Sequence, residues 1–198
     1  GGAKVSDKIG VMEALMSKVD ALLVGGAMAN TFLSAQGHGV GKSLCETDKL
    51  ALARSLMGTA EEAGVDLLLP IDVRVGDSVE ASTAQVASVS AIPADAMALD
   101  IGPETEALFR ERLRKAQAVF WNGPMGLFEN PAFAEGTLAV ARAAADCPGF
   151  SVVGGGDSVA AVKQAELADR FDHVSTGGGA SLEYLEGRPL PGVEALKP

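Results

Sequence analysis

The chain has 198 residues, of which 47% are hydrophobic and 21% are charged, and its formal net charge is −10. This composition is typical of a folded globular protein and argues against a disordered one. The acidic charge argues against broad electrostatic binding to nucleic acid or to an anionic membrane. An anionic ligand would therefore have to be held locally, by helix ends, a few lysines and a divalent cation.

Apolar runs alternate along the chain with stretches of helical periodicity. Helices are expected at residues 5–18, 27–36, 46–63, from Pro103 onward, 131–146, 157–169 and 178–185. Strands are expected at residues 20–24, 65–73, 97–101, 118–121, 150–153 and 173–175. Residues 76–94 are rich in Ser, Ala and Val and are expected to form an extended excursion on the surface. The alternation predicts one α/β domain, with a doubly wound, mainly parallel sheet and helices on both faces, a Rossmann-like three-layer sandwich.

Localisation is expected to be cytoplasmic. No apolar stretch is as long as a membrane span, and the first residues do not follow a signal-peptide pattern. Cys45 and Cys147 lie far apart in the sequence and form neither a metal-type nor a redox-type pair, which fits a reducing compartment. His38 and His173 are isolated, and no Ser or Cys arrangement points to hydrolytic chemistry.

Four of the expected strands end in a glycine-rich turn that leads into a helix. The turns are Gly25-Gly26, Asn122-Gly123-Pro124, Gly154-Gly155-Gly156 and Gly177-Gly178-Gly179, and a fifth, Gly1-Gly2, opens the chain. Glycine lets the backbone turn sharply and lets a ligand approach the amides closely. The helix that follows directs free N–H groups and its positive dipole end toward the turn. A row of such turns along one sheet edge suggests a phosphorylated ligand.

Two segments resemble known nucleotide-binding motifs, but each lacks a residue that its motif requires. Gly39-Val40-Gly41-Lys42-Ser43 resembles the end of a P-loop, but Gln36 stands where that motif needs its first glycine, and the preceding residues have helical periodicity instead of a strand. Residues 154–159 do not match the dinucleotide fingerprint, because Val159 stands where its third glycine or alanine belongs.

Other motifs leave alternatives open. Asp157 could cap its helix, or its carboxylate could hold Mg²⁺. The turn around Gly178 could be a tight connection, or an amide cradle for developing negative charge. Lys4 and Lys8 are expected on one face of a helix that begins near Val5, either as a solvated pair or at the ligand edge.

The loop at residues 121–129 also has two interpretations. It could be a packed loop, or it could offer apolar surface to a base and the carboxylate of Glu129 to sugar hydroxyls.

Taken together, these motifs resemble phosphoglycerate kinase, specifically its C-terminal, nucleotide-binding half. The motifs match in order and spacing over essentially the whole chain: Gly1-Gly2-Ala3-Lys4-Val5-Ser6-Asp7-Lys8, Trp121-Asn122-Gly123-Pro124, Gly154-Gly155-Gly156-Asp157 and Ser175-Thr176-Gly177-Gly178-Gly179-Ala180-Ser181-Leu182-Glu183. The ending Leu190-Pro191-Gly192-Val193-Glu194-Ala195-Leu196 is similar to that of bacterial members. The resemblance implies a glycolytic enzyme that transfers a phosphoryl group reversibly between ATP and 3-phosphoglycerate, with ADP and 1,3-bisphosphoglycerate on the other side. It also implies Mg²⁺ with the nucleotide and a monomeric complete enzyme.

The resemblance further implies roles for residues at matching positions. Lys4, with the backbone amides of Gly178 and Gly179, would contact the phosphoryl group in transit, and Lys8 would neutralise the nucleotide phosphates. Asp157 would ligate Mg²⁺, with amides at Gly156 and Ser158 on the phosphates. Glu129 would bind the ribose hydroxyls, with Asn122 and Pro124 close by. The adenine would be enclosed by Gly2, Ala3, Gly26, Ala27, Leu44, Leu99 and Leu127. Ala27 departs from many members, which have a third glycine there, and its methyl group should narrow this pocket slightly.

The resemblance also implies what the chain lacks. The family's phosphoglycerate-binding half, its hinge helix and a strand that leads into Gly1 have no counterpart in this sequence. We therefore expect a nucleotide-binding fragment, nearly inactive alone, with an exposed gap in its sheet. One alternative is a non-catalytic module that binds nucleotide and docks onto a partner. A P-loop hydrolase is a further alternative, which the mismatch to the P-loop motif disfavours.

Overall fold

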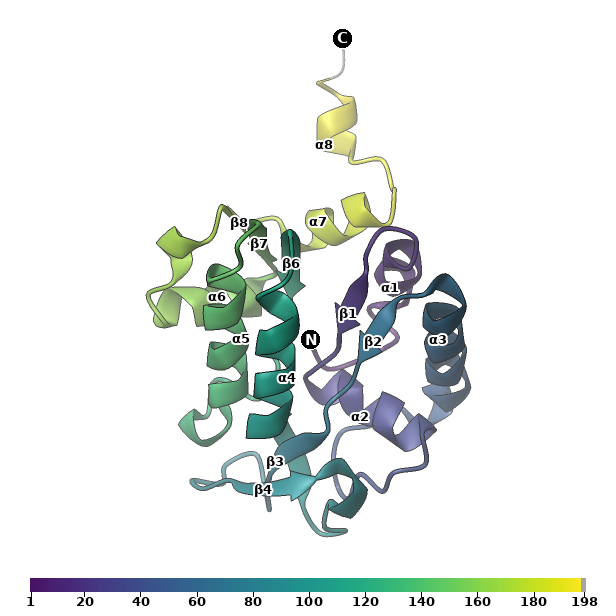
Figure 1. The fold of residues 1–198 in the computed structure, drawn as a ribbon, viewed down its shortest axis with the longest axis vertical. Coiled ribbons are helices and arrows are strands. Elements are labelled where there is room, and N and C mark those ends of the chain that lie inside the picture. Colours follow the sequence, from purple (N-terminus) through teal and green to yellow (C-terminus); the bar gives the residue numbers. More distant parts are fainter. Residues whose placement is uncertain (197–198) are drawn as a thin grey trace.

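The computed structural model describes residues 1–196 and has the expected α/β organisation (Figure 1). Its helices are α1 (Ile9–Leu15), α2 (Ala27–Ala35), α3 (Leu50–Ala63), α4 (Pro103–Leu113), α5 (Glu135–Ala145), α6 (Gly156–Gln164), α7 (Gly178–Leu185) and α8 (Pro191–Glu194). Its strands are β1 (Ala21–Leu23), β2 (Asp66–Leu68), β3 (Asp72–Gly76), β4 (Gln85–Ser88), β5 (Met97–Ile101), β6 (Ala118–Asn122), β7 (Phe150–Gly154) and β8 (His173–Ser175). The described residues also contain 3₁₀ turns at Thr47–Lys49, Val89–Ala91, Pro131–Phe133 and Ala168–Arg170.

The strands form three hydrogen-bonded ladders. β6, β7 and β8 are parallel, and so are β1 and β2, which confirms the predicted parallel pairing. The third ladder, β4-β3-β5, is antiparallel. The prediction of one strand over residues 65–73 was wrong: β2 and β3 are separate strands on either side of Pro70. Proline has no N–H to donate, so the run is interrupted there and the chain enters a different ladder.

Several boundaries also differ from the prediction. Residues 76–94 contain β4, whose partner β3 comes earlier in the chain. The segment expected as one helix at 131–146 is a 3₁₀ turn followed by α5, and the helix expected at 157–169 ends at Gln164, shortly before Glu166 adopts a φ of 57°. A left-handed backbone at a residue other than glycine ends the α-helical path.

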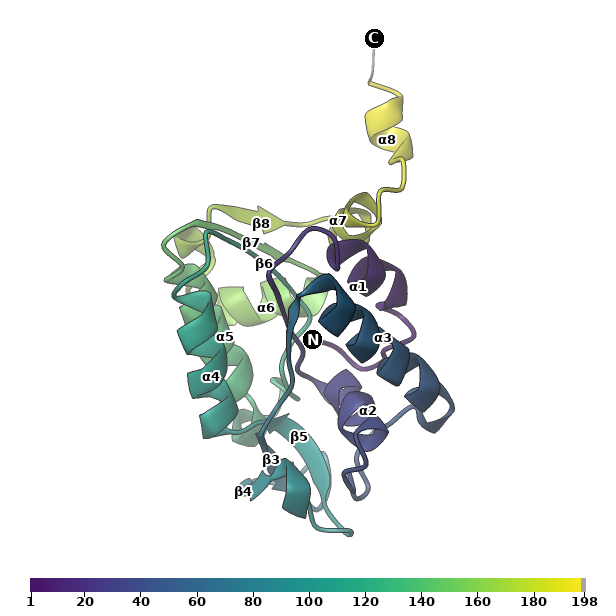
Figure 2. The same ribbon diagram turned by 45° about the vertical axis from the view of Figure 1, so that its right-hand side comes forward.

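Helices α4, α5 and α6 cover one face of the β6–β8 ladder, and α7 borders the other face. One face carries Trp121 and Val153, which are buried in a cluster with Phe109 of α4, Ala141 of α5 and Val162 of α6. The opposite face carries Phe120 and Val152, which line a groove of about 380 Å³ together with Ala180 and Tyr184 of α7. Figure 2 shows α4 and α5 on one side of the ladder and α7 at its end. The predicted helix–sheet–helix layering is therefore present.

A second core lies around β1. Val24, at the end of β1, packs with Val5 and with residues of α2 and α3, including Phe32 and Leu56. Among residues 1–196, β1 pairs only with β2 and β6 only with β7, so the parallel strands do not form one continuous sheet. Gly1 and Gly2 lie between the turns that follow β6 and β1: the Gly1 nitrogen donates to the Asn122 carbonyl (2.8 Å) and Gly2 accepts from Met28.

The C-terminal part leaves the globular body. α8 projects from the molecule beyond α7 (Figures 1 and 2), and all of its residues are exposed. None of the helices among residues 1–196 is both long and apolar enough to span a bilayer.

Candidate functional site

The glycine turns contact one another along one edge of the two parallel ladders. A β-carbon built on Gly26 would lie 2.6 Å from the carbonyl oxygen of Gly2. One built on Gly123 would lie 2.1 Å from the carbonyl oxygen of Gly1. Both glycines have positive φ angles, +72° and +87°, so the turns after β1 and β6 need glycine for conformation as well as for space.

The row continues through the turns after β7 and β8. A β-carbon on Gly155, whose φ is +95°, would lie 2.7 Å from the Nδ2 atom of Asn122. One on Gly178 would lie 2.5 Å from the Cα atom of Gly155. Five segments distant in sequence thus place their backbones side by side at the carboxyl ends of the strands, where parallel α/β folds bind ligands.

Asn122 connects three of these segments. Its carbonyl accepts from the Gly1 nitrogen, its Oδ1 atom accepts from the ammonium of Lys8, and its Nδ2 donates to the Gly154 carbonyl at 2.9 Å. The sequence predicts Asn122 only as a neighbour of the ribose; in the structure its polar atoms hold Lys8 against the turn after β7.

Lys8 and Lys4 do not share a helix face, so that prediction was wrong. α1 begins at Ile9, and residues 5–8 form a turn closed by a hydrogen bond from the Lys8 N–H to the Val5 carbonyl (2.9 Å). The side chain of Lys4 is exposed and, among residues 1–196, has no hydrogen bond or ion pair. Lys8 is half-buried, and burial lowers the pKa of its ammonium, while the nearby carboxylates of Asp7 and Asp157 oppose that change.

Asp157 is the second residue of α6 and lies at the helix start beside Lys8. The N-cap position is Gly155, and no side chain makes a capping hydrogen bond there. The structure therefore does not support the interpretation of Asp157 as a cap. Its carboxylate is exposed and, in the part of the chain that the structure describes, forms no hydrogen bond or ion pair. The next residue, Ser158, is fully buried and its Oγ atom accepts from the Gly123 N–H at 2.6 Å.

The amides of Gly178 and Gly179 lie in the first turn of α7, whose N-cap is Gly177. No side chain caps this helix, so these N–H groups remain available at its positive end. Gly156 occupies the same kind of position in α6.

The apolar residues predicted around the adenine lie at the other end of the row. The Leu127 N–H donates to the Leu99 carbonyl at 2.8 Å, and the Gly26 N–H donates to the Met125 carbonyl at 2.8 Å. Leu44 is 51% exposed and is brought to the same region by its neighbour Ser43, whose Oγ atom accepts from the Ala98 N–H.

The remaining predicted residues lie on the open side of this region. Ala3 and Glu129 are exposed, whereas Pro124 and Ala27, the first residue of α2, are half-buried. Within residues 1–196, Glu129 makes no hydrogen bond or ion pair that would compete with a ligand.

The rejected P-loop is also absent structurally. Residues 39–43 follow α2 and precede a loop, with one isolated bridge from Gly41 to Met97. Ser43 is buried and holds β5, so its hydroxyl is not free for a metal.

Glu46 is a residue that the sequence analysis did not identify. Its carboxylate accepts hydrogen bonds from the Ser6 hydroxyl (2.5 Å) and the Ser6 N–H (3.1 Å). The pKa of this carboxyl is lowered: its partial desolvation acts the other way and is outweighed by the hydrogen bonds from Ser6 and Val5. No local motif could reveal this contact, because Glu46 and Ser6 are 40 residues apart.

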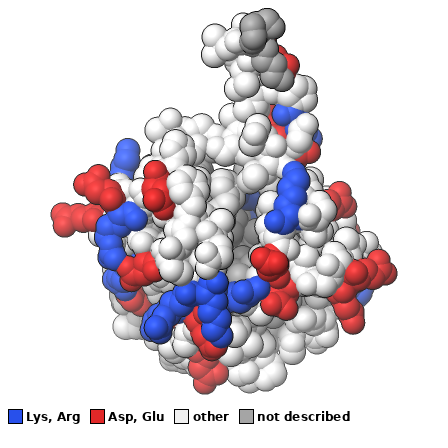
Figure 3. Space-filling model, turned by 45° about the horizontal axis from the view of Figure 1, so that its top comes forward, with Lys and Arg blue, Asp and Glu red and all other residues white. Residues whose placement is uncertain are grey.

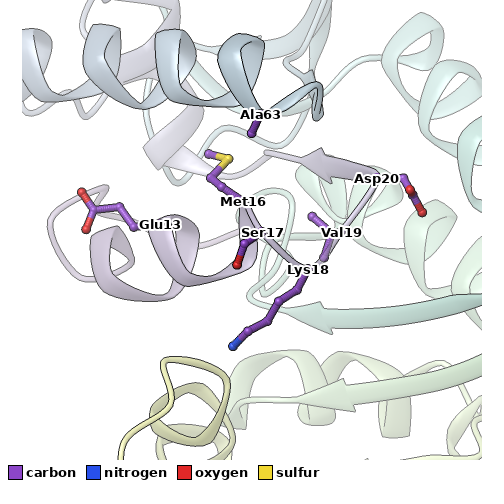
Figure 4. A pocket seen from close by; sticks show the side chains of 7 residues that line it. All are labelled: Glu13, Met16, Ser17, Lys18, Val19, Asp20 and Ala63. Atoms are coloured by element: carbon purple, nitrogen blue, oxygen red, sulfur yellow. The ribbon is translucent and has the colours of Figure 1, made fainter.

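Charged side chains of both signs lie on the surface, and a further cavity lies elsewhere in the described residues. Figure 3 shows acidic and basic side chains interspersed on one face. A cavity of about 520 Å³ is lined by the end of α1, the start of β1 and the end of α3, where Met16 points toward Ala63 (Figure 4). It lies at the amino end of β1, away from the glycine turns.

Comparison with known proteins finds similarity to the phosphoglycerate kinase family. A family model described as phosphoglycerate kinase matches residues 1–188. Curated phosphoglycerate kinases from Roseiflexus castenholzii and Thermus thermophilus are each 59% identical to this chain, which covers 50% and 51% of their lengths. The solved phosphoglycerate kinase structure from Coxiella burnetii superposes with a TM-score of 0.94 at 46% identity, over 98% of this chain and 50% of that one. The structure from Pyrococcus horikoshii gives a TM-score of 0.79 at 33% identity, over 99% and 50%. The chain spans about half the length of the relatives it matches.

Proposed function

Because this chain belongs to the phosphoglycerate kinase family, we propose that it forms the nucleotide-binding half of such an enzyme and holds Mg·ADP or Mg·ATP along the row of glycine turns. The observation that carries the proposal is the contact between successive turns, from Gly26 through Gly2 and Gly123 to Gly155 and Gly178. This row combines exposed amides, two helix starts and the ammonium of Lys8, which are the groups that bind a polyphosphate locally.

The adenosine would lie at the α2 end of the row. Leu99 and Leu127 supply apolar surface there, and Glu129 is an exposed carboxylate without a competing partner among residues 1–196. A base would pack against the leucines, and Glu129 would accept hydrogen bonds from the ribose hydroxyls.

The residues present fit a magnesium ion that arrives with the nucleotide. Within residues 1–196 there is no group of three or more His, Cys, Asp or Glu side chains that could hold a metal. Mg²⁺ in such sites commonly takes one or two carboxylates and fills its other positions with phosphates and water. Asp157 offers one carboxylate beside the free amides of α6, and the bound ion would neutralise phosphate charge.

Phosphoryl transfer needs positioning and charge neutralisation more than it needs a protein nucleophile. Lys4 and the amides of Gly178 and Gly179 would face the phosphoryl group in transit, while Lys8 would stay with the nucleotide phosphates. The acceptor, 3-phosphoglycerate, would bind to the other half of the whole enzyme, as would 1,3-bisphosphoglycerate in the reverse direction. This chain alone is therefore expected to bind nucleotide with nearly no turnover.

Isothermal titration calorimetry of the purified chain tests the binding proposal. We expect Mg·ADP to bind more tightly than ADP in the presence of a chelator. Lys42→Ala serves as the control, since the exposed Lys42 belongs to the rejected P-loop motif and should not change the affinity. Absence of Mg·ADP binding, or binding abolished by Lys42→Ala, would overturn the proposal.

A further inference from the structure

The loop that carries Lys4 and Lys8 is held at its centre by one carboxylate. Glu46, which lies between α2 and α3, accepts from both the hydroxyl and the N–H of Ser6, at 2.5 and 3.1 Å. Ser6 is midway between the two lysines. A carboxylate bound by several donors at once is fixed in direction as well as in place.

Glu46 is itself fixed from the adenine side of the site. Its N–H donates to the Oγ1 atom of Thr31 at 3.1 Å, and the preceding Asn30 donates through Nδ2 to the Leu44 carbonyl at 3.2 Å. Thr31 and Asn30 are 1% and 3% exposed, and both belong to α2, the helix that begins after the Gly25-Gly26 turn. The backbone around Leu44 and the loop around Ser6 are thus tied to the same helix.

The two lysines depend on this arrangement to different degrees. The ammonium of Lys8 has a second anchor, the Oδ1 atom of Asn122. The side chain of Lys4 is exposed and has no partner among residues 1–196, so its location follows from the loop backbone alone.

The loop does not depend on Glu46 for its attachment to the protein. Val5, next to Ser6, is 0% exposed and packs with Val24, Met28 and Phe32 in the core. This apolar contact retains the loop, whereas the directional hydrogen bonds to Glu46 set the orientation of the turn.

From these contacts we infer that Glu46 is a positioning residue: it orients the Lys4–Lys8 loop relative to α2, so that phosphate groups and adenine are bound in a fixed relation. The inference rests on the proposed nucleotide-binding function. Without Glu46 the adenosine part of the nucleotide should bind with unchanged affinity, while the phosphate groups should bind more weakly.

The test compares Mg·ADP with adenosine by calorimetry on this chain. For Glu46→Ala we expect the affinity for Mg·ADP to fall about tenfold, the scale of a charge-assisted hydrogen-bond pair, with adenosine affinity changed less than about twofold. Glu46→Gln keeps one acceptor for Ser6 and should give an intermediate loss. A purely structural residue would weaken both ligands together.

Asp48→Asn is the matched control, because Asp48 is an exposed carboxylate two residues away that pairs with Lys49 and not with the loop. Simple charge removal near an anion should tighten Mg·ADP binding, which is opposite in sign to the expected effect of Glu46→Gln. Tighter or unchanged Mg·ADP binding by both Glu46 variants would overturn the inference and leave the proposed function standing.

Hydrogen exchange separates the two proposals if nucleotide binding fails altogether. Glu46→Ala should speed exchange at the Ser6 amide while the core amides of α2 and α3 keep their protection. Unchanged exchange at Ser6 would overturn the positioning role regardless of nucleotide. Faster exchange without any wild-type Mg·ADP affinity would overturn the proposed function and, with it, the role in phosphate binding.

Discussion

Lys8 and Asp157 lie close together in the proposed phosphate region but are held differently. The Lys8 ammonium is half-buried and bonded to Asn122, whereas the Asp157 carboxylate is exposed and forms no hydrogen bond or ion pair among the described residues. An ammonium that is already held in place and a carboxylate without a partner among the described residues suit a ligand that brings both phosphates and a cation.

Replacing Asp157 by Ala should weaken Mg²⁺-dependent ADP binding by about 1–3 kcal/mol, the scale for losing a charged partner. Calorimetry with and without Mg²⁺ measures this change, and the affinity without Mg²⁺ should barely alter. Asp169→Ala is the control, because Asp169 is an exposed carboxylate just beyond the other end of α6. Equal effects of the two substitutions would show that only net charge matters.

The lowered pKa of Lys8 gives nucleotide affinity a dependence on alkaline pH. Burial lowers this pKa from the ordinary 10.5, and the phosphates bind the protonated amine, so affinity is present below the lowered pKa and lost as pH rises through it. We expect a decline of about 1–3 kcal/mol as the charge disappears. Lys8→Arg should flatten the profile, since a guanidinium stays charged. A wild-type curve that stays level up to pH 10.5 would contradict this role.

The sequence predicts individual site residues well where they stand in a short recognisable motif. The turn glycines, Asp157 and both lysines stand in recognisable motifs. The contacts of Asn122 and Glu46 could not be predicted, because the Asn122–Lys8 and Glu46–Ser6 pairs join residues 114 and 40 positions apart. Such pairs depend on the order of strands in space, which no short motif encodes.

Among the elements, the strand-to-helix turns are the most constrained. Gly155, the N-cap of α6, combines a φ of +95° with close contact to Asn122, whereas a β-carbon on the adjacent Gly156 would meet no atom within 4 Å. A side chain should therefore be tolerated at Gly156 but not at Gly155.

Gly155→Ala should destabilise the protein by about 1–3 kcal/mol through backbone strain and displacement of Asn122. Gly156→Ala should be neutral or slightly stabilising, because the helical backbone accepts alanine and the unfolded chain loses freedom. Urea unfolding of both variants measures the difference. A Gly155→Ala variant as stable as Gly156→Ala would contradict the assigned geometry.

Asp100 of β5 joins several elements beneath the region proposed to bind adenine. Its carboxylate accepts from the N–H of Gly136 in α5 at 2.7 Å and lies 3.4 Å from Arg74 of β3, which also pairs with Glu106 of α4. Burial raises the pKa of Asp100 to about 7, and the hydrogen bond from Gly136 and the charge of Arg74 only partly oppose this.

The raised pKa means that the folded state binds a proton more tightly than the unfolded state between pH 3.8 and about 7. The stability from Asp100 is complete below pH 3.8 and lost as pH rises through 7, about 4 kcal/mol in total at 1.36 kcal/mol per pH unit. Asp100→Asn should lack this decline, so the difference in unfolding free energy between wild type and variant should change across that window. Urea unfolding from pH 4 to 8 tests it, with the exposed Asp95→Asn as control; parallel curves for wild type and Asp100→Asn would refute it.

Element prediction succeeded where local pattern and pairing agree. β5 and α7 have the predicted bounds, and α4 begins at Pro103, as its position at a helix start suggested. The prediction of a single strand over residues 65–73 was wrong because Pro70 breaks the run, and this proline is visible in the sequence. β4 was missed as a strand because its exposed residues show no apolar alternation and are ordered by pairing with β3.

On the scale of the whole molecule, the groups proposed to bind nucleotide all lie within residues 1–196, while the proposed reaction needs a second surface. The chain spans about half of its relatives, and its described residues supply the glycine turns, lysines and carboxylates assigned above. Binding and turnover should therefore separate experimentally.

Phosphoryl transfer should appear only when the phosphoglycerate-binding half of a relative is added or joined. In that complete enzyme, Lys4→Ala should lower kcat more than nucleotide affinity, as expected for a group used mainly in the transition state. A coupled assay of ATP formation from 1,3-bisphosphoglycerate measures both parameters. Full turnover by the isolated chain would contradict the proposal that both halves are needed. An unchanged kcat in the Lys4→Ala enzyme would show that Lys4 does not act in the reaction.

The projecting α8 has a practical consequence for anyone who handles this protein. Arg188 lies exposed just before it and pairs with the nearby Glu186, and none of the following residues up to Leu196 is buried. A protease with little sequence preference, such as subtilisin, should therefore trim the chain within residues 187–196 before it reaches the packed body, leaving a shorter species that retains every glycine turn.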